Sequence, residues 1–154
     1  MLSSLYRIYC NQLTEEITID NKLSLRGKKV LVVEDNKNNM EIAEELLTQD
    51  GIICTCVMNG KECIDYVSKA RYGDIDLILM DIMMPIMDGY EATKLIREFK
   101  DDYISSIPIV AMTANVLEED KKKALKLGMN DYITKPIDFE EFRMILAKYL
   151  INDR

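Results

Sequence analysis

The sequence contains no histidine and no tryptophan among its 154 residues, and it has only four cysteines. Zinc sites usually combine closely spaced cysteine and histidine ligands, so the missing histidines argue against a zinc centre. Cys54 and Cys56 lie two residues apart in a predicted strand, where local geometry makes a mutual disulfide difficult. We therefore expect these thiols to be reduced and buried.

An excess of basic charge is also missing. Lysine and arginine total 20 against 27 aspartates and glutamates, which gives a formal charge of −7 and a pI near 4.7. Proteins that bind nucleic acid need positive charge to neutralise phosphates. The composition therefore argues against direct nucleic-acid binding by this chain and favours proteins as its partners.

Long apolar runs are absent as well. No run approaches the roughly 20 residues that span a bilayer, and the amino terminus lacks the basic-then-apolar order of a signal peptide. We expect a cytoplasmic fragment that makes no membrane contact itself, whether or not a longer parent protein is membrane-anchored. The length fits one domain of ordinary size.

Short apolar runs alternate with helical patterns from residue 29 onward, which is typical of βαβ units and a parallel sheet. The nearly uninterrupted runs 30–33, 77–80 and 107–112 predict inner strands that helices cover on both faces. The mixed run 52–57 and the short run 132–133 suit the sheet edges. The sequence predicts an α/β fold with a doubly wound, five-stranded parallel sheet of order 2-1-3-4-5 and five flanking helices.

Apolar stripes and capping residues locate several of these helices. Two stripes at helical spacing should lie against the sheet, and they consist of Ile42, Ala43, Leu46 and Leu47, and of Ala92, Leu95, Ile96 and Phe99. Gly51 and Gly128 should each follow a helix end. Two pairs have the spacing of helix N-caps, namely Asn115 with Glu118, and Asp138 with Glu141.

Residues 1–26 differ in kind from the rest. One helical stripe contains Leu2, Leu5, Tyr6, Tyr9 and Leu13. The apolar residues of 17–19 and 23–25 alternate across a polar turn like a small hairpin. We interpret 1–26 as a linker or the tail of a preceding domain, and 27–154 as the domain that carries the chemistry.

Polar residues follow the predicted strands at one rim of the sheet. Glu34 and Asp35 follow the first strand, Asp81 the third, Thr113 the fourth and Lys135 the fifth. Ligands of open parallel sheets bind at this rim, outside the carboxyl ends of the strands. The sequence therefore predicts one site that contains all five residues.

Three carboxylates at one point repel each other unless a cation shares the site. Mg²⁺ favours octahedral oxygen coordination and keeps several waters, so Glu34, Asp35, Asp81 and the Met83 carbonyl can supply its protein ligands. Lys135 and Thr113 can neutralise and hydrogen-bond a phosphoryl group on the other side. This set meets the needs of phosphoryl transfer, which depends mainly on positioning and charge neutralisation.

Four motifs in order resemble the response-regulator receiver family, over residues 28 to about 150. They are Val32-Val33-Glu34-Asp35-Asn36, Leu79-Met80-Asp81 through Asp88-Gly89, Ala111-Met112-Thr113-Ala114, and Gly128-Met129-Asn130-Asp131-Tyr132-Ile133-Thr134-Lys135-Pro136. The 25–29 lead-in and the Gly89-Tyr90-Glu91-Ala92-Thr93 continuation resemble most the C-terminal receivers of hybrid sensor histidine kinases. The family has a flavodoxin-like fold and acts in two-component and phosphorelay signalling.

The resemblance implies a role for each rim residue. Asp81 would be the phosphoacceptor, Glu34 and Asp35 the metal-site acids, and Lys135 the phosphate partner. Met83 would add its backbone carbonyl to the Mg²⁺ shell. Thr113 and Tyr132 would form a switch that remodels protein contacts, and the Lys135-Pro136 bond would be cis.

The resemblance also implies a signalling domain that catalyses its own phosphorylation and dephosphorylation and is not an enzyme with a separate substrate. A chain without histidine cannot be its own phosphohistidine donor. The donor must be a histidine kinase or a histidine phosphotransfer domain. Output must pass through contacts with a downstream protein partner or back into a phosphorelay. The stimulus, the particular partners, the oligomeric state and the lifetime of the phosphorylated state do not follow from the sequence.

Other interpretations have less support. An aspartate-dependent phosphohydrolase usually has a second aspartate where Met83 stands, and a dinucleotide-binding domain needs a glycine-rich turn where Glu34-Asp35-Asn36 stands. A receiver-like interaction module that no longer accepts phosphate would not need Glu34, Asp35, Asp81, Thr113 and Lys135, so their presence argues against it. Asp88-Gly89 suits a turn and helix start, the methionines suit packing rather than soft-metal binding, and Tyr132 also suits a half-buried edge-strand aromatic.

Overall fold

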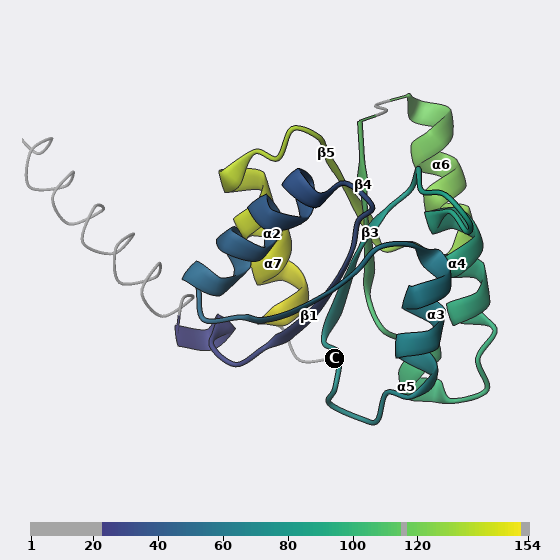
Figure 1. The fold of residues 1–154 in the computed structure, drawn as a ribbon, viewed down its shortest axis with the longest axis horizontal. Coiled ribbons are helices and arrows are strands. Elements are labelled where there is room, and N and C mark those ends of the chain that lie inside the picture. Colours follow the sequence, from purple (N-terminus) through teal and green to yellow (C-terminus); the bar gives the residue numbers. More distant parts are fainter. Residues whose placement is uncertain (1–22, 115–116, 152–154) are drawn as a thin grey trace, which may run out of the picture.

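A computed structural model describes residues 23–114 and 117–151 (Figure 1). Five parallel strands form one sheet in the order β2-β1-β3-β4-β5. The strands are β1 Lys29–Val33, β2 Ile53–Val57, β3 Leu77–Asp81, β4 Ile109–Thr113 and β5 Asp131–Thr134. The predicted α/β class, doubly wound topology and strand order are confirmed.

Burial separates the inner strands from the edge strands as predicted. Every residue of β3 and β4 is buried, whereas β2 has no buried residue and β5 has one. Inner strands lie beneath helices on both faces and so require apolar side chains throughout. This difference explains why the inner strands were recognisable as continuous apolar runs.

Helices cover both faces of the sheet (Figure 1). They are α2 Lys37–Gln49, α3 Gly60–Ser68, α4 Gly89–Arg97, α5 Asp102–Ser105, α6 Glu118–Leu127 and α7 Phe139–Leu150. Buried residues of α2 and α7 join one core cluster, and those of α3, α4 and α6 join the other. The five longer helices match the five predicted; the short α5, which begins at the capping residue Asp101, was not predicted.

The predicted stripe of α2 is partly wrong. Ala43 and Leu47 are buried, but the Ile42 side chain is 46% exposed. Ile42 lies at the border of the helix near Pro136 and Ile137, where the sheet no longer covers it. The stripe of α4 is confirmed. Ala92 and Ile96 are buried, and the other two members, Leu95 and Phe99, are half-buried.

Most of the predicted helix ends are confirmed. Gly51 and Gly128 follow α2 and α6 with φ angles of 77° and 108°, in the left-handed region that glycine adopts without strain. Asp138 caps α7 through hydrogen bonds from the backbone N–H groups of residues 140 and 141. Asn115, which lies outside the described residues, is not the cap of α6.

The N-cap position of α6 belongs to Leu117, which has no side-chain capping bond. Three acidic residues in the first turn, Glu118, Glu119 and Asp120, stabilise this end of the helix in place of a cap. The helix therefore begins later than the Asn115 spacing suggested.

The hairpin predicted before residue 26 is wrong in its second arm. Residues 23–25 are helical, and the N–H groups of Arg26 and Lys28 donate to the Leu23 and Leu25 carbonyls. Leu25 is buried in the core beneath α2 and α7, so tertiary burial favours a helical turn over a strand that has no partner. The first arm and the apolar stripe at 2–13 lie outside the described residues.

The described cysteines are free thiols, as predicted. The sulfurs of Cys54 and Cys56 lie 3.6 Å apart on β2 and are half-exposed, so their predicted burial is wrong. The cause is the edge position of β2, which leaves this face only partly covered. Cys63 is buried, and burial raises the pKa of its thiol to about 12.

Candidate functional site

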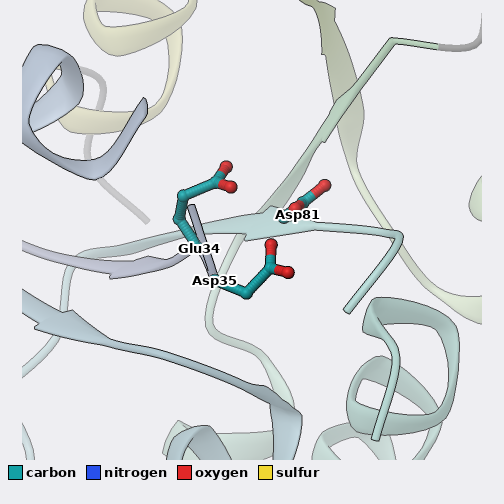
Figure 2. A group of neighbouring side chains, drawn as sticks. All are labelled: Glu34, Asp35 and Asp81. Carbon is teal, nitrogen blue, oxygen red and sulfur yellow. The ribbon is translucent and has the colours of Figure 1, made fainter. Parts of the chain in front are cut away.

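Three carboxylates converge at the carboxyl end of the sheet (Figure 2). Glu34 and Asp35 directly follow β1, and Asp81 is the last residue of β3, the neighbouring strand. Carboxylate oxygens from the three residues all lie within 4.8 Å of one another. Parallel pairing of β1 with β3 therefore places all three predicted acids together.

The first of these acids is fixed by its surroundings. Glu34 is 1% exposed, and its carboxylate accepts a hydrogen bond of 3.1 Å from the backbone N–H of Asn36. Its own N–H donates to the Val57 carbonyl on β2. The Asn36 side chain caps α2, so the helix start and the acid pair are held by the same short turn.

Lys135 is the cation of the site. It follows β5, and its Nζ atom lies 2.5 Å from Glu34 Oε2 and 3.3 Å from Asp81 Oδ1. Its backbone N–H donates to the Thr113 carbonyl at 2.8 Å. The Lys135-Pro136 peptide bond is cis, as the family resemblance implied. The lysine therefore bridges acids that come from two different strands.

The electrostatic balance at Asp81 favours a neutral carboxyl group. Burial raises its pKa from the ordinary 3.8 to about 7, because the charged form is poorly solvated. The nearby Lys135 ammonium acts in the opposite direction, and the Glu34 carboxylate adds to the increase. More positive charge is needed to keep Asp81 ionised at neutral pH.

Thr113 and Met83 lie at the same end of the sheet. Thr113 is the last residue of β4, is 6% exposed and pairs in register with Thr134, the residue before Lys135. Met83 is two residues beyond Asp81, and its side chain is 77% exposed. The contacts thus unite Glu34, Asp35, Asp81 and Lys135, and the backbone places Thr113 on the adjoining strand end.

Gly89 allows α4 to begin against the acceptor strand. A β-carbon at this position would overlap the Asp81 carbonyl oxygen, and the Gly89 N–H donates to the Ile82 carbonyl at 2.9 Å. Asp88 caps the helix by accepting from the Glu91 N–H. The structural role predicted for Asp88-Gly89 is confirmed. The sequence did not predict that the start of α4 packs so closely against β3 that only glycine fits.

Tyr132 lies half-buried on the edge strand β5 and packs against the core. The Nζ atom of Lys121 lies 4.4 Å from the centre of its ring, and Lys123 makes a similar contact with Tyr90. These two cation–π contacts connect the charged helix α6 to β5 and α4. Sequence spacing alone gives no signal for them because the partners come from β5 and α4.

The donor set suits a hard divalent cation. The oxygens of Glu34, Asp35 and Asp81 match the ligands that Mg²⁺ prefers, and a bound cation would oppose the increase that burial causes in the pKa of Asp81. Lys135 occupies one side of the cluster, so a cation would bind among the acids on the side nearer Asp35. The residues present therefore fit a magnesium ion.

Fold and site together define an open α/β sheet protein with an acidic, lysine-flanked centre at the carboxyl ends of its strands. Residues 30–147 match the family model described as the response regulator receiver domain. The chain therefore belongs to the receiver domain family of response regulators.

Curated relatives include long hybrid kinases. The chain is 41% identical over 133 residues to hybrid signal transduction histidine kinase I of Dictyostelium discoideum, and 43% identical over 134 residues to kinase B of that organism. These matches cover 82% and 81% of this chain but only 8% and 7% of the kinases. The chain thus corresponds to a small part of each kinase.

Solved receiver structures share the fold. The receiver domain of sensor histidine kinase PA1611 from Pseudomonas aeruginosa, with magnesium coordinated in its active-site cleft, has a TM-score of 0.72 and 37% identity. That match covers 82% of this chain and 99% of the other. The Saccharomyces cerevisiae Ssk1 receiver, crystallised with the phosphotransfer protein Ypd1, has a TM-score of 0.73 and 33% identity, covering 81% and 90% of the two chains.

Proposed function

We propose that Asp81 accepts a phosphoryl group from a phosphohistidine and that the chain thereby acts in a phosphorelay. The observation that carries the proposal is the placement of Asp81 within 3.3 Å of Lys135 and within 4.8 Å of the other two acids. A nucleophilic carboxylate thus has an ammonium group and a cation-binding acid pair beside it. The magnesium-bound PA1611 receiver supports the same arrangement.

The transfer is a substitution at phosphorus. An oxygen of the Asp81 carboxylate forms the new O–P bond as the P–N bond to the donor imidazole breaks. The electrons of the P–N bond stay on the imidazole nitrogen, which takes up a proton from water. Lys135 neutralises a phosphoryl oxygen, and the Thr113 hydroxyl donates a hydrogen bond to another. Glu34, Asp35, Asp81 and the Met83 carbonyl would hold Mg²⁺, which would supply the remaining positive charge.

The same groups serve the chain's own dephosphorylation, in which water attacks phosphorus and restores the Asp81 carboxylate. The chain is a signalling domain in this proposal, and its chemistry acts on itself. Phosphorylation requires an ionised Asp81, which Lys135 favours against the effect of burial. In dephosphorylation the Asp81 carboxylate is the leaving group, and the same positive charge stabilises it as it departs.

The output follows from a change in protein contacts. Thr113 moves toward the phosphoryl group and Tyr132 turns inward, which alters the surface formed by α6, β5 and α7. That surface meets a downstream protein partner. Phosphohistidine comes from a histidine kinase or a histidine phosphotransfer domain, because this sequence contains no histidine.

None of the helices in 23–114 and 117–151 has the length and apolarity to cross a membrane. The proposed phosphoryl transfer from a histidine kinase or a histidine phosphotransfer domain is consistent with a cytoplasmic location.

Intact mass after incubation with acetyl phosphate and Mg²⁺ tests the acceptor. We expect one phosphoryl group on the wild type, none on Asp81→Asn, and normal labelling of Asp65→Asn, a matched change at an exposed aspartate of α3. If neither acetyl phosphate nor a phosphohistidine protein labels the wild type, the chain is a phosphate-independent interaction module.

A further inference from the structure

The loop between β3 and α4 contains an unusual backbone conformation. Ile86 has a φ angle of 70°, and among the described residues no other non-glycine residue has a positive φ. The Met87 N–H donates to the Pro85 carbonyl at 2.8 Å, which closes a three-residue γ-turn around Ile86. A γ-turn with positive φ is rare and strained, and a β-branched residue is among the least suited to it.

The Ile86 side chain gives no compensating burial. It is 78% exposed, so the isoleucine gains little from the hydrophobic core while its backbone adopts a disfavoured conformation. Glycine or asparagine would fit the same turn with less strain. An exposed apolar residue at a strained position is therefore unfavourable for the isolated fold.

The loop joins the acceptor strand β3 to α4. It leaves β3 at Asp81 and returns at Gly89, which abuts the Asp81 carbonyl. Ile86 is three residues before Gly89, so their Cα atoms lie within about 11 Å. A protein interface of ordinary size, about 800 Å² on each partner, has a radius of roughly 16 Å. A donor domain centred on Asp81 thus covers Ile86.

The chemistry of the loop indicates what covers it. Residues 82–87 carry no charge, in a chain whose net charge is −7, and Met83 in the same loop is 77% exposed. A donor surface that met this loop with charged groups would bury them without partners. Apolar contact is the favourable alternative.

We infer that Ile86 is a donor-selecting residue, held out by the strained turn to contact an apolar surface around the phosphohistidine of a protein donor. This inference rests on the proposed phosphoacceptor role of Asp81 and adds the kind of surface that the donor presents. Ile86 touches no reacting atom in this scheme. It raises the rate of transfer from a protein donor and has no part in transfer from a small one.

The test compares phosphorylated Ypd1 with acetyl phosphate as donors to the full chain. For Ile86→Asn, we expect the labelling rate with phosphorylated Ypd1, divided by the rate with acetyl phosphate, to fall roughly tenfold. The Tm should rise by about 3 °C or more, because the turn is relieved of strain. Ile86→Leu, which keeps an apolar side chain, should retain most of the transfer from Ypd1.

The matched control is Tyr72→Asn, which changes a residue that is 89% exposed at the opposite, amino end of the strands. It should leave the ratio unchanged. An unchanged ratio in Ile86→Asn, or a lower Tm, would overturn the inference. A wild type that accepts phosphate from acetyl phosphate and from no phosphohistidine protein would also overturn it, while the proposed role of Asp81 would stand.

Discussion

Lys135 Nζ lies 3.3 Å from Asp81 Oδ1 and 2.5 Å from Glu34 Oε2, so one ammonium group serves two buried carboxylates. The three residues come from the ends of β1, β3 and β5. Removal of the ammonium would leave both acids without their cation. The resulting loss in the free energy of unfolding should exceed what an exposed ion pair contributes.

The first prediction concerns this ammonium. Lys135→Ala should destabilise the Mg²⁺-free fold by about 3 kcal/mol, since buried acids lose their partner. Phosphorylation by acetyl phosphate should slow at least tenfold. Urea unfolding and intact mass measure the two effects.

The control for Lys135→Ala is Lys148→Ala, which removes a lysine paired with Asp131 at the surface at 3.1 Å. Lys148 is 60% exposed and its pair with Asp131 lies in a more solvated setting than the Lys135 contacts, so the unfolding midpoint should change much less than in Lys135→Ala. Equal effects of the two substitutions would show that the Lys135 contacts contribute no more than a surface pair.

The second prediction concerns pH. The pKa of Asp81 is about 7 in the fold and 3.8 ordinarily, so the folded state holds a proton that the unfolded state has released. Without metal, stability should therefore fall as pH rises from about 4 to about 7. Asp81→Asn should be more stable than wild type by about 2 kcal/mol at pH 8, and by much less at pH 4.5.

Urea unfolding at both pH values measures this difference. Asp65→Asn, a change at an exposed carboxylate, should show no such pH dependence. A stabilisation by Asp81→Asn that is equal at the two pH values would mean that the Asp81 carboxyl group does not titrate between them.

The sequence alone predicted much of the fold and of the site. Parallel strands covered on both faces need continuous apolar runs, and their carboxyl ends share one rim, so Glu34, Asp35, Asp81, Thr113 and Lys135 could be placed there before any coordinates. Contacts between side chains that are far apart in the sequence could not be predicted, because no sequence pattern indicates them. The rings beneath Lys121 and Lys123, and the strained turn at Ile86, depend on how separate elements meet.

Predictions from local apolar patterns were wrong where tertiary packing determined the conformation or the burial of a residue. Leu25 alternates with its neighbours like a strand residue but is buried in a helical turn, and Ile42 has core spacing but lies at an exposed border. In each case burial by neighbouring elements, which the local pattern does not contain, determined the conformation.

The third prediction concerns Mg²⁺. The ion should raise the Tm of the wild type, because it binds the folded acid cluster and not the unfolded chain; at one hundred times its Kd the gain is about 2.7 kcal/mol. Asp35→Asn should lose most of this gain. Differential scanning fluorimetry at constant ionic strength measures it, with NaCl as the control for screening. A wild type that responds equally to both salts would lack a specific metal site.

The fourth prediction concerns Gly89. Gly89→Ala should cost about 2 kcal/mol or more, because the new methyl group overlaps the Asp81 carbonyl oxygen, and it should also slow phosphorylation. Gly73→Ala is the control, since a methyl group there meets open space and only the positive φ of 89° opposes it. Thermal unfolding of both variants compares the costs. A smaller loss at Gly89 than at Gly73 would mean that α4 can move away from the acceptor strand.

The decisive measurement is tandem mass spectrometry that locates the phosphoryl group after transfer from a phosphohistidine protein, with Mg²⁺ and with EDTA. We predict a single modified residue, Asp81, labelled only with Mg²⁺ and absent in Asp81→Asn. Label on another residue, or label that persists in Asp81→Asn, would contradict the assignment of Asp81 as the phosphoacceptor.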